Sequence, residues 1–196
     1  MRYRTMLGIV LAMSAMSLLS PAFAGDGLEA TLNELVTRHQ NGADASKEFD
    51  IQEDEANAYI REHSAKELPE GIESPWVKFE ESLAIVGATL DLDKLQGGLP
   101  DSAILQLLSG RVPVEVTARI IAAAGVGKLV LERVTLSGIE LPPDLVASFI
   151  SDEKASAFLP PGFRLGEAFT LPLGLESIQC LPGTVKVVQR ATAPLK

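Results

Sequence analysis

The longest regular pattern in the chain runs from residue 112 to residue 141 and alternates apolar with polar positions at a period of two. Successive side chains of a strand point to opposite faces, so the pattern predicts strands with one buried and one solvated face. Residues 125–127, Gly-Val-Gly, predict the turn between two arms. Each arm is about twice the usual 5–6 residues of a strand. So long an antiparallel hairpin is expected to coil.

The two arms of this hairpin differ in regularity. On the first arm the alternation is unbroken, whereas on the second it slips near Glu132 or Arg133 and then resumes. A slip of one residue indicates a β-bulge, which bends and twists a strand. The apolar face then comprises Val112, Val114, Val116, Ala118, Ile120 and Ala122 on the first arm and Leu129, Leu131, Val134 and Leu136 on the second.

Shorter patterns predict the other elements. Apolar residues at helical spacing indicate helices, and alternating or β-branched runs bounded by turn residues indicate strands. The predicted helices are residues 28–40, 52–63, 101–110 and 142–159. The predicted strands are residues 47–51, a hairpin of 76–81 and 81–93 with a short loop around Glu80 to Ser82, and a last strand at 183–190. Residues 159–177 are expected to be loop with extended pieces.

The first 24 residues have the three parts of a secretory signal peptide. Arg2 and Arg4 precede an apolar run over residues 6–19, and Ala22-Phe23-Ala24 forms a small-x-small cleavage site. We expect cleavage after Ala24 and export to the periplasm; an uncleaved anchor is the alternative, although the run is shorter than the about 20 residues of a membrane span. The residue directly after the cleavage site is Gly25 and not a cysteine, so lipid attachment there is excluded.

The charge balance is acidic. The chain has 17 basic and 26 acidic residues, a net charge of −9, and removal of Arg2 and Arg4 leaves 15 against 26, or −11. This balance disfavours nucleic acid and anionic membrane surfaces, which bind basic patches. Cys180 is the only cysteine, so no intramolecular disulfide can form, and its apolar neighbours Ile178 and Leu181 indicate a buried hydrophobe. No later segment is apolar and long enough for a stable membrane span.

Residues suited to catalysis are scarce. Neither a Gly-x-Ser-x-Gly elbow nor a His-Glu-x-x-His motif occurs, and His39 and His63 are the only histidines. Asp91 and Asp93 lack the further oxygen ligands of a calcium site. The sequence therefore predicts a protein that is not an enzyme, with no cofactor, no metal site and no catalytic residues.

The order of the predicted elements is distinctive. A short strand, a helix and a strand pair ("FDIQEDEANAYIREH" and its continuation) precede a long strand that enters a helix ("GKLVLERVTLSGIELPPDLV"), and "LPLGLESIQCLPGTVKVV" closes the chain. Over about Phe49 to Gln189, this order resembles the small single-domain tubular lipid-binding (TULIP-like) proteins of the bacterial envelope, both lipoproteins and periplasmic phospholipid-binding proteins. Glu53, Glu55 and Asn57 match the helix-opening pattern Thr/Ser-Glu-x-Glu-apolar-Asn of that family, whereas Gln52 replaces its hydroxyl residue.

The resemblance implies an α+β fold in which a long, strongly curved antiparallel sheet wraps around a helix and encloses acyl chains or another apolar ligand. The chain would then divide into a signal peptide (1–24), an N-terminal helix and linker (25–48), a TULIP-like lipid-binding domain (49–190) and a flexible tail (191–196). The lipobox of the lipoprotein members is absent, so their anchoring is not implied.

We assign the wall of the groove to residues that point to the same face of each strand and include small side chains, which leave room for a ligand. The candidate ligand-binding residues are Val86, Ala88, Val114, Val116, Ala118, Ile120, Leu129 and Leu131, faced by Leu145 and Phe149 from the helix. The expected function is a periplasmic carrier or sensor of a lipid or other apolar small molecule. An apolar sheet face also forms when a sheet simply packs on a helix. The alternative is therefore a non-enzymatic interaction module for envelope proteins, with a filled core and no ligand.

Overall fold

The computed structural model describes residues 27–68, 70–94, 110–142, 146 and 166–191. The predicted signal peptide, most of the two predicted helices at 101–110 and 142–159, and the end of the tail lie outside these ranges.

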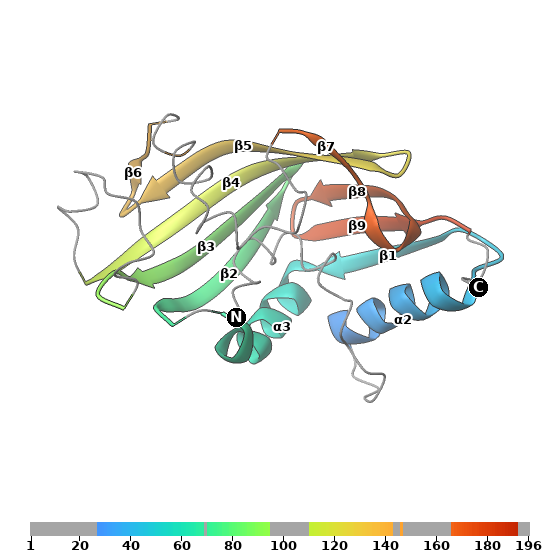
Figure 1. Cartoon of the computed structure of the whole chain (residues 1–196), viewed down its shortest axis with the longest axis horizontal. Coiled ribbons are helices and arrows are strands. Elements are labelled where there is room, and N and C mark those ends of the chain that lie inside the picture. The colour runs from blue at the N-terminus through green and yellow to red at the C-terminus, as the bar shows by residue number, and fades with distance from the viewer. Residues whose placement is uncertain (1–26, 69, 95–109, 143–145, 147–165, 192–196) are drawn as a thin grey trace.

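The long hairpin is the centre of a single antiparallel sheet of nine described strands, in the order β1-β9-β8-β4-β3-β2 with β5 on the other side of β4 (Figure 1). Its arms are β4 (Arg111–Ala123) and β5 (Val126–Leu136). The short strands β6 (Ile139–Glu140) and β7 (Ala168–Thr170) pair with β5.

Two separate groups of strands join one side of β4. The hairpin of β2 (Ile72–Glu80) and β3 (Leu83–Asp91) lies along the first nine residues of β4. Beyond it, β8 (Leu175–Leu181) pairs with β4 at Ala122 and Ile178 and continues into β9 (Thr184–Gln189) and β1 (Lys47–Gln52).

Ser82, in the turn between β2 and β3, connects the two groups of strands. Its N–H donates to the Cys180 carbonyl of β8 at 3.0 Å, and its own carbonyl accepts from Ile120 N of β4 at 3.2 Å. The residue has a φ of 61°, a left-handed conformation that this tight turn requires.

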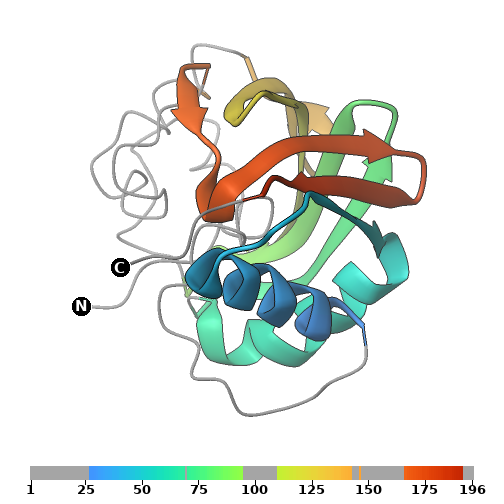
Figure 2. The ribbon, with the colours of Figure 1, turned by 90° about the vertical axis from the view of Figure 1, so that its right-hand side faces the viewer.

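The sheet curls strongly, and helix α3 (Glu53–Glu67) lies where its two margins approach each other (Figure 2). β1 and β2 are the terminal strands of the main path, and α3, which connects them in sequence, contacts both. Helix α2 (Leu28–Asn41) packs beside α3 and β1. The predicted α+β architecture with a strongly curved antiparallel sheet is therefore confirmed at this level.

Side chains of α3 form hydrogen bonds with the backbone of β2 along the edge that does not pair with β3. Asn57 Nδ2 donates to the Val77 carbonyl at 2.7 Å, and Asn57 Oδ1 accepts from Val77 N at 2.8 Å. Four residues earlier, Glu53 Oε2 accepts from Phe79 N at 2.7 Å. Gly183, in the turn between β8 and β9, donates to the Phe79 carbonyl and accepts from Glu53 N, at 3.0 and 2.9 Å. These bonds pair an edge strand that would otherwise expose its backbone groups.

The motif residues that support the family resemblance thus have structural partners. Glu53 and Asn57 lie four positions apart, on one side of the helix, and both face β2. Glu55 Oε2 accepts a hydrogen bond from Gln52 N at 3.2 Å at the start of α3, as in a capping box.

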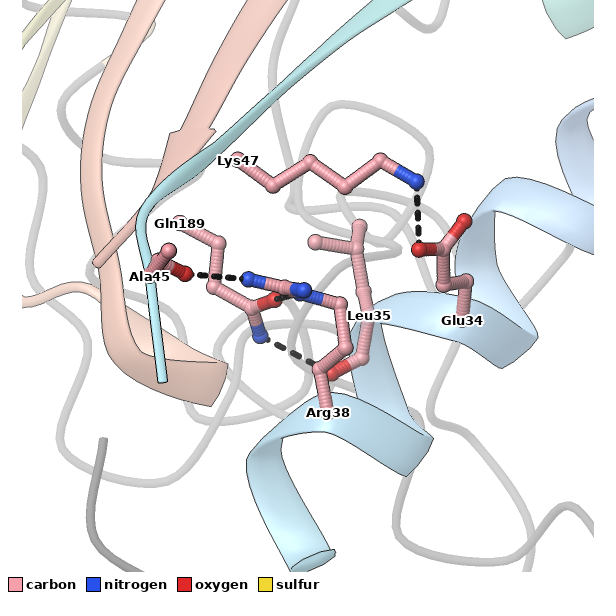
Figure 3. A network of polar contacts seen from close by, with 6 residues as sticks. All are labelled: Glu34, Leu35, Arg38, Ala45, Lys47 and Gln189. Carbon is pink, nitrogen blue, oxygen red and sulfur yellow. Dashed lines mark hydrogen bonds and ion pairs between the residues drawn. The ribbon is translucent and has the colours of Figure 1, made fainter. Parts of the chain in front are cut away.

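Gln189, which is fully buried at the end of β9, attaches α2 to the sheet (Figure 3). Its Nε2 donates to the carbonyls of Leu35 and Leu173 at 2.9 and 2.8 Å, and its Oε1 accepts from Arg38 Nε at 2.9 Å. Arg38 also donates to the Ala45 carbonyl at 2.6 Å. Three bonds on one buried amide remove the cost of its desolvation and hold three separate segments together.

Buried apolar residues form two clusters inside the curl. The larger one lies between the helices and the group β1-β9-β8-β2, and it includes Leu35 of α2, so this helix belongs to the same core as the sheet. The smaller one lies toward the other end of the long hairpin and contains Leu92, Val112, Leu136 and Leu141.

Two expectations from the sequence were wrong in detail. The hairpin turns at Ala124 and Gly125, not at residues 125–127, because both have positive φ, 53° and 79°, as a two-residue turn of this type requires. Residues 175–181 form β8, although residues 175–177 were expected as loop with extended pieces and no strand was predicted at residues 178–181. A register shift between Leu175 and Ser177 interrupts its alternation and hides the strand from a period-two pattern.

Candidate ligand-binding face

The inner face of the long hairpin is the side that points into the curl. It continues across β3 and β2, because Ala84 and Val77 on these strands belong to the same cluster as Ala56 and Ile60 of α3. We use "inner face" for this side of β3, β4 and β5, and "outer face" for the opposite side.

The structure brings the eight described candidate residues together on the inner face. Val86 pairs with Val116 and Ala88 with Val114 across β3 and β4. Ala118 pairs with Leu131 and Ile120 with Leu129 across β4 and β5. The predicted sharing of one face is confirmed by this register. Leu145 and Phe149 lie outside the described residues, and a ligand role for all ten stays a prediction.

The predicted bulge is present and maintains this face. Thr117 pairs with Arg133 and Ala118 with Leu131, so Glu132 is the additional residue on β5. Because one residue is inserted, Val134 and Leu136 return to the same side as Leu129 and Leu131. Without the bulge, the second half of β5 would turn its apolar side chains to solvent.

The candidate residues differ in burial. Ala88, Ala118 and Leu129 are buried, with exposed fractions of 7, 4 and 5 %. The other five, Val86, Val114, Val116, Ile120 and Leu131, are partly buried. Of these, Val86 and Ile120 pack against the larger cluster and Val114 against the smaller one. The face is therefore continuous between the two clusters.

Charged side chains of β2 to β5 occupy the outer face or the bulge. The register places Glu73, Lys78, Glu115, Arg119 and Arg133 on the side opposite to the candidate residues. Arg119 Nε lies 2.6 Å from Glu132 Oε1, so the carboxylate of the bulge residue is paired on the outer face. The inner face of β3, β4 and β5 contains only aliphatic residues and glycine.

Further residues have the same parity as the candidates but were not included in the predicted site. Leu90 lies on β3, and Val134 and Leu136 follow the bulge on β5. Val77 and Phe79 of β2 extend the same face at its other margin. The alternation of the sequence already indicated the first three, whereas the pairing of β2 with β3 was needed to place the last two.

Two other groups with possible chemistry, His63 and Asp91, have local partners. His63 stacks on Tyr59 with ring centroids 4.0 Å apart, and its Nδ1 lies 2.9 Å from the Tyr59 carbonyl oxygen. Partial burial of Asp91 favours its neutral form, but hydrogen bonds and charge from Lys94 outweigh this effect and lower the pKa of the Asp91 carboxyl. Within the described residues, no three His, Cys, Asp or Glu side chains gather as a metal site.

Cys180 lies in the larger cluster with 1 % of its surface exposed. Burial raises the pKa of its thiol to about 11. At neutral pH the sulfur is thus a protonated, apolar group, and thiolate chemistry is suppressed.

Among the helices that the structure describes, none has the length and apolar character needed to cross a membrane. Comparison with protein-family models and with curated proteins found no match to this chain.

Proposed function

We propose that the protein is an exported, periplasmic binding protein for an apolar ligand, a lipid, and that it acts as a carrier or sensor in the cell envelope. The observation that carries this proposal is the uncharged, aliphatic inner face of β3, β4 and β5, which continues between two clusters while the charged residues occupy the other side. The TULIP-like resemblance of the sequence supports the same function.

The length of the inner face suits an acyl chain. From Val112 to Ala122 the face covers eleven residues of β4, a length of about 33 Å at the usual rise of about 3.3 Å per residue. One acyl chain extends over about half of the 30 Å hydrocarbon core of a bilayer. A chain laid along β4 would therefore lie wholly within the apolar strip.

Burial alone supplies the affinity in this mechanism. Transfer of an acyl chain from water gains about 0.8 kcal/mol for each CH₂ group, so a dozen buried carbons contribute about 10 kcal/mol before the entropy of association is subtracted. The carrier therefore needs no catalytic group, cofactor or metal, in agreement with the absence of catalytic motifs from the sequence.

Native mass spectrometry of the protein purified from a periplasmic extract tests this proposal. A bound lipid is expected to add a mass of several hundred daltons, and organic extraction of the same sample should release it. N-terminal sequencing of that material should begin at Gly25 if export proceeds by cleavage after Ala24. A protein that shows only its own mass, and takes up no fatty acid when offered one, would support the alternative of an interaction module with a filled core.

A further inference from the structure

The end of the long hairpin exposes apolar side chains on the outer face. Ile121 and Val126 are 52 and 49 % exposed, and Ala123 and Ala124 beside them are exposed as well. The register places Ala123 opposite Val126 on the same side of the sheet as Ile121. We call these four residues the hairpin tip.

The backbone of the hairpin tip is held in place. Gly125 N donates to the Glu176 carbonyl, and Leu171 N donates to the Gly125 carbonyl, both at 2.9 Å. Val126 also pairs with Thr170 of β7. The apolar side chains are thus presented on a rigid support, so that a partner would not have to order them on contact.

The turn sequence departs from what folding alone favours. A two-residue turn with two positive φ angles is usually Asn-Gly or Asp-Gly, because a side chain such as that of Ala124 is disfavoured at a φ of 53°. A polar residue would fit this backbone better and would be solvated. Alanine instead keeps the tip small and apolar, which indicates an apolar partner.

At the same end of the hairpin, the inner face is also apolar. Ala122 and Gly127 pair there on the inner side, next to Ile120 and Leu129 of the candidate ligand-binding face. The hairpin tip is therefore the place where an exposed apolar surface adjoins the proposed lipid wall.

The charges around the hairpin tip are mixed. Lys128 is exposed on the outer face opposite Ile121, and the Arg190 side chain lies against Gly125, 3.6 Å from the position that a Cβ there would take. Glu176, which binds Gly125 through its carbonyl, is also exposed. Cations and an anion around an apolar centre suit head groups that carry both charges, whereas the net charge of −9 opposes approach to a strongly anionic surface.

We propose that the hairpin tip docks transiently on a membrane of zwitterionic phospholipid, where the protein loads or releases its ligand. The inference rests on the proposed function, since it names the surface that the carrier meets. A second copy of the chain is the weaker occupant, because two half-exposed aliphatic side chains and two alanines cannot bury the about 1,200 Å² that a stable interface needs.

Flotation of the full, processed protein with phosphatidylcholine vesicles tests the docking. Ile121→Asp is compared with Ile139→Asp, which makes the same change at a residue that is 65 % exposed at the other end of β5. We expect Ile121→Asp to lower the vesicle-bound fraction by at least about fivefold, since it removes apolar area from the contact, and Ile139→Asp to leave the fraction unchanged. Val126→Asp should lower the vesicle-bound fraction in the same way. Because both side chains are about half exposed, neither substitution should change the melting temperature.

Three results would overturn the proposal: no flotation of the parent, equal losses in the Ile121 and Ile139 variants, or flotation unaffected by both tip variants. A parent that is dimeric in solution, and that the tip variants convert to monomer without loss of flotation, would assign the tip to a second copy. If the aspartate variants were less stable than the parent, Ile121→Ser and Val126→Ser would decide the same question.

Uptake of a soluble fluorescent fatty acid without vesicles separates this inference from the proposed function. The tip variants should bind the fatty acid as the parent does, while transfer from vesicles slows. A parent that floats but never binds the fatty acid would leave the docking surface standing and refute the carrier. A parent that binds the fatty acid but never floats would support the carrier function and refute the docking surface.

Discussion

Asn57 and Val77 pair through both atoms of the Asn57 side-chain amide. Nδ2 donates to the Val77 carbonyl at 2.7 Å, and Oδ1 accepts from Val77 N at 2.8 Å. The side chain thereby takes the place of a neighbouring strand at the edge of β2 and attaches the N-terminal part of α3 to the sheet.

Replacement of Asn57 should destabilise the fold and uncover this edge. Asn57→Ala leaves both backbone groups of a buried residue without a partner, so the free energy of unfolding is expected to fall by about 2–3 kcal/mol. Asn57→Asp retains the acceptor for Val77 N but loses the donor, and should also be destabilising. Urea unfolding measures both, with Glu62→Ala on the exposed side of α3 as a control. Sedimentation should detect self-association of Asn57→Ala, because an open strand edge pairs with other chains.

Gln189 allows a second test of buried pairing. Gln189→Leu removes the partner of the carbonyls of Leu35 and Leu173 and is expected to cost about 1–3 kcal/mol. Gln189→Glu should cost more, because it turns a carboxylate oxygen toward two carbonyl oxygens in the core. Gln179→Leu, at an exposed position of the adjacent strand β8, should change stability by less than about 0.5 kcal/mol. Equal effects at positions 179 and 189 would refute this role for the buried amide.

Cys180 should make stability depend on pH in the alkaline range. Burial raises the pKa of its thiol from 9.0 to about 11, so the unfolded chain loses the proton first as the pH rises. The contribution of the group is complete below pH 9 and is lost as the pH approaches 11. The loss amounts to about 2–3 kcal/mol for a shift of this size.

Comparison of the parent with Cys180→Ala isolates this effect from the titration of lysines and tyrosines. The difference between their unfolding free energies should be largest below pH 9 and should decrease toward pH 11. A difference that is constant over this range would mean that the thiol is not protected. Alkylation by iodoacetamide at neutral pH should likewise require unfolding.

Ala118→Trp distinguishes an open inner face from a filled core. If the face holds a ligand, the indole should occupy the ligand's volume, abolish lipid uptake and leave the melting temperature nearly unchanged. If Ala118 is close-packed, overpacking should cost about 1–3 kcal/mol or more. Thr117, the neighbour of Ala118 on β4, points to the outer face. Thr117→Trp therefore adds the same indole outside the inner face and should change neither lipid uptake nor the melting temperature. A sharp loss of stability at position 118, with no lipid found in the parent, would indicate a scaffold.

The two histidines test the absence of catalysis. His39→Ala and His63→Ala should leave ligand binding intact, because neither residue belongs to the inner face of β3, β4 and β5. Loss of the protein's activity in either variant, with an unchanged circular dichroism spectrum, would support an enzymatic function.

The sequence alone determined the long hairpin, its apolar face and its bulge. These features depend on side-chain parity and neighbouring residues, which are visible along the chain: Leu129 and Leu131 alternate in one phase, Val134 and Leu136 in the other, and Glu132 lies between them. The ends of α2 and α3 were predictable to within a few residues for the same reason, since a helix face repeats at short spacing.

The tertiary structure alone decided which polar side chains hold the fold together. Glu53 and Asn57 match a helix-opening pattern in the sequence, but that pattern does not show their partners, because the strand edge that they complete lies 20 or more positions later. Gln189 gives no local signal either, since two of its partners lie more than 150 positions earlier in the chain. Their roles arise only when the sheet curls and brings β1 and β2 to the same helix, because hydrogen bonds depend on distance in space and are not encoded by spacing along the chain.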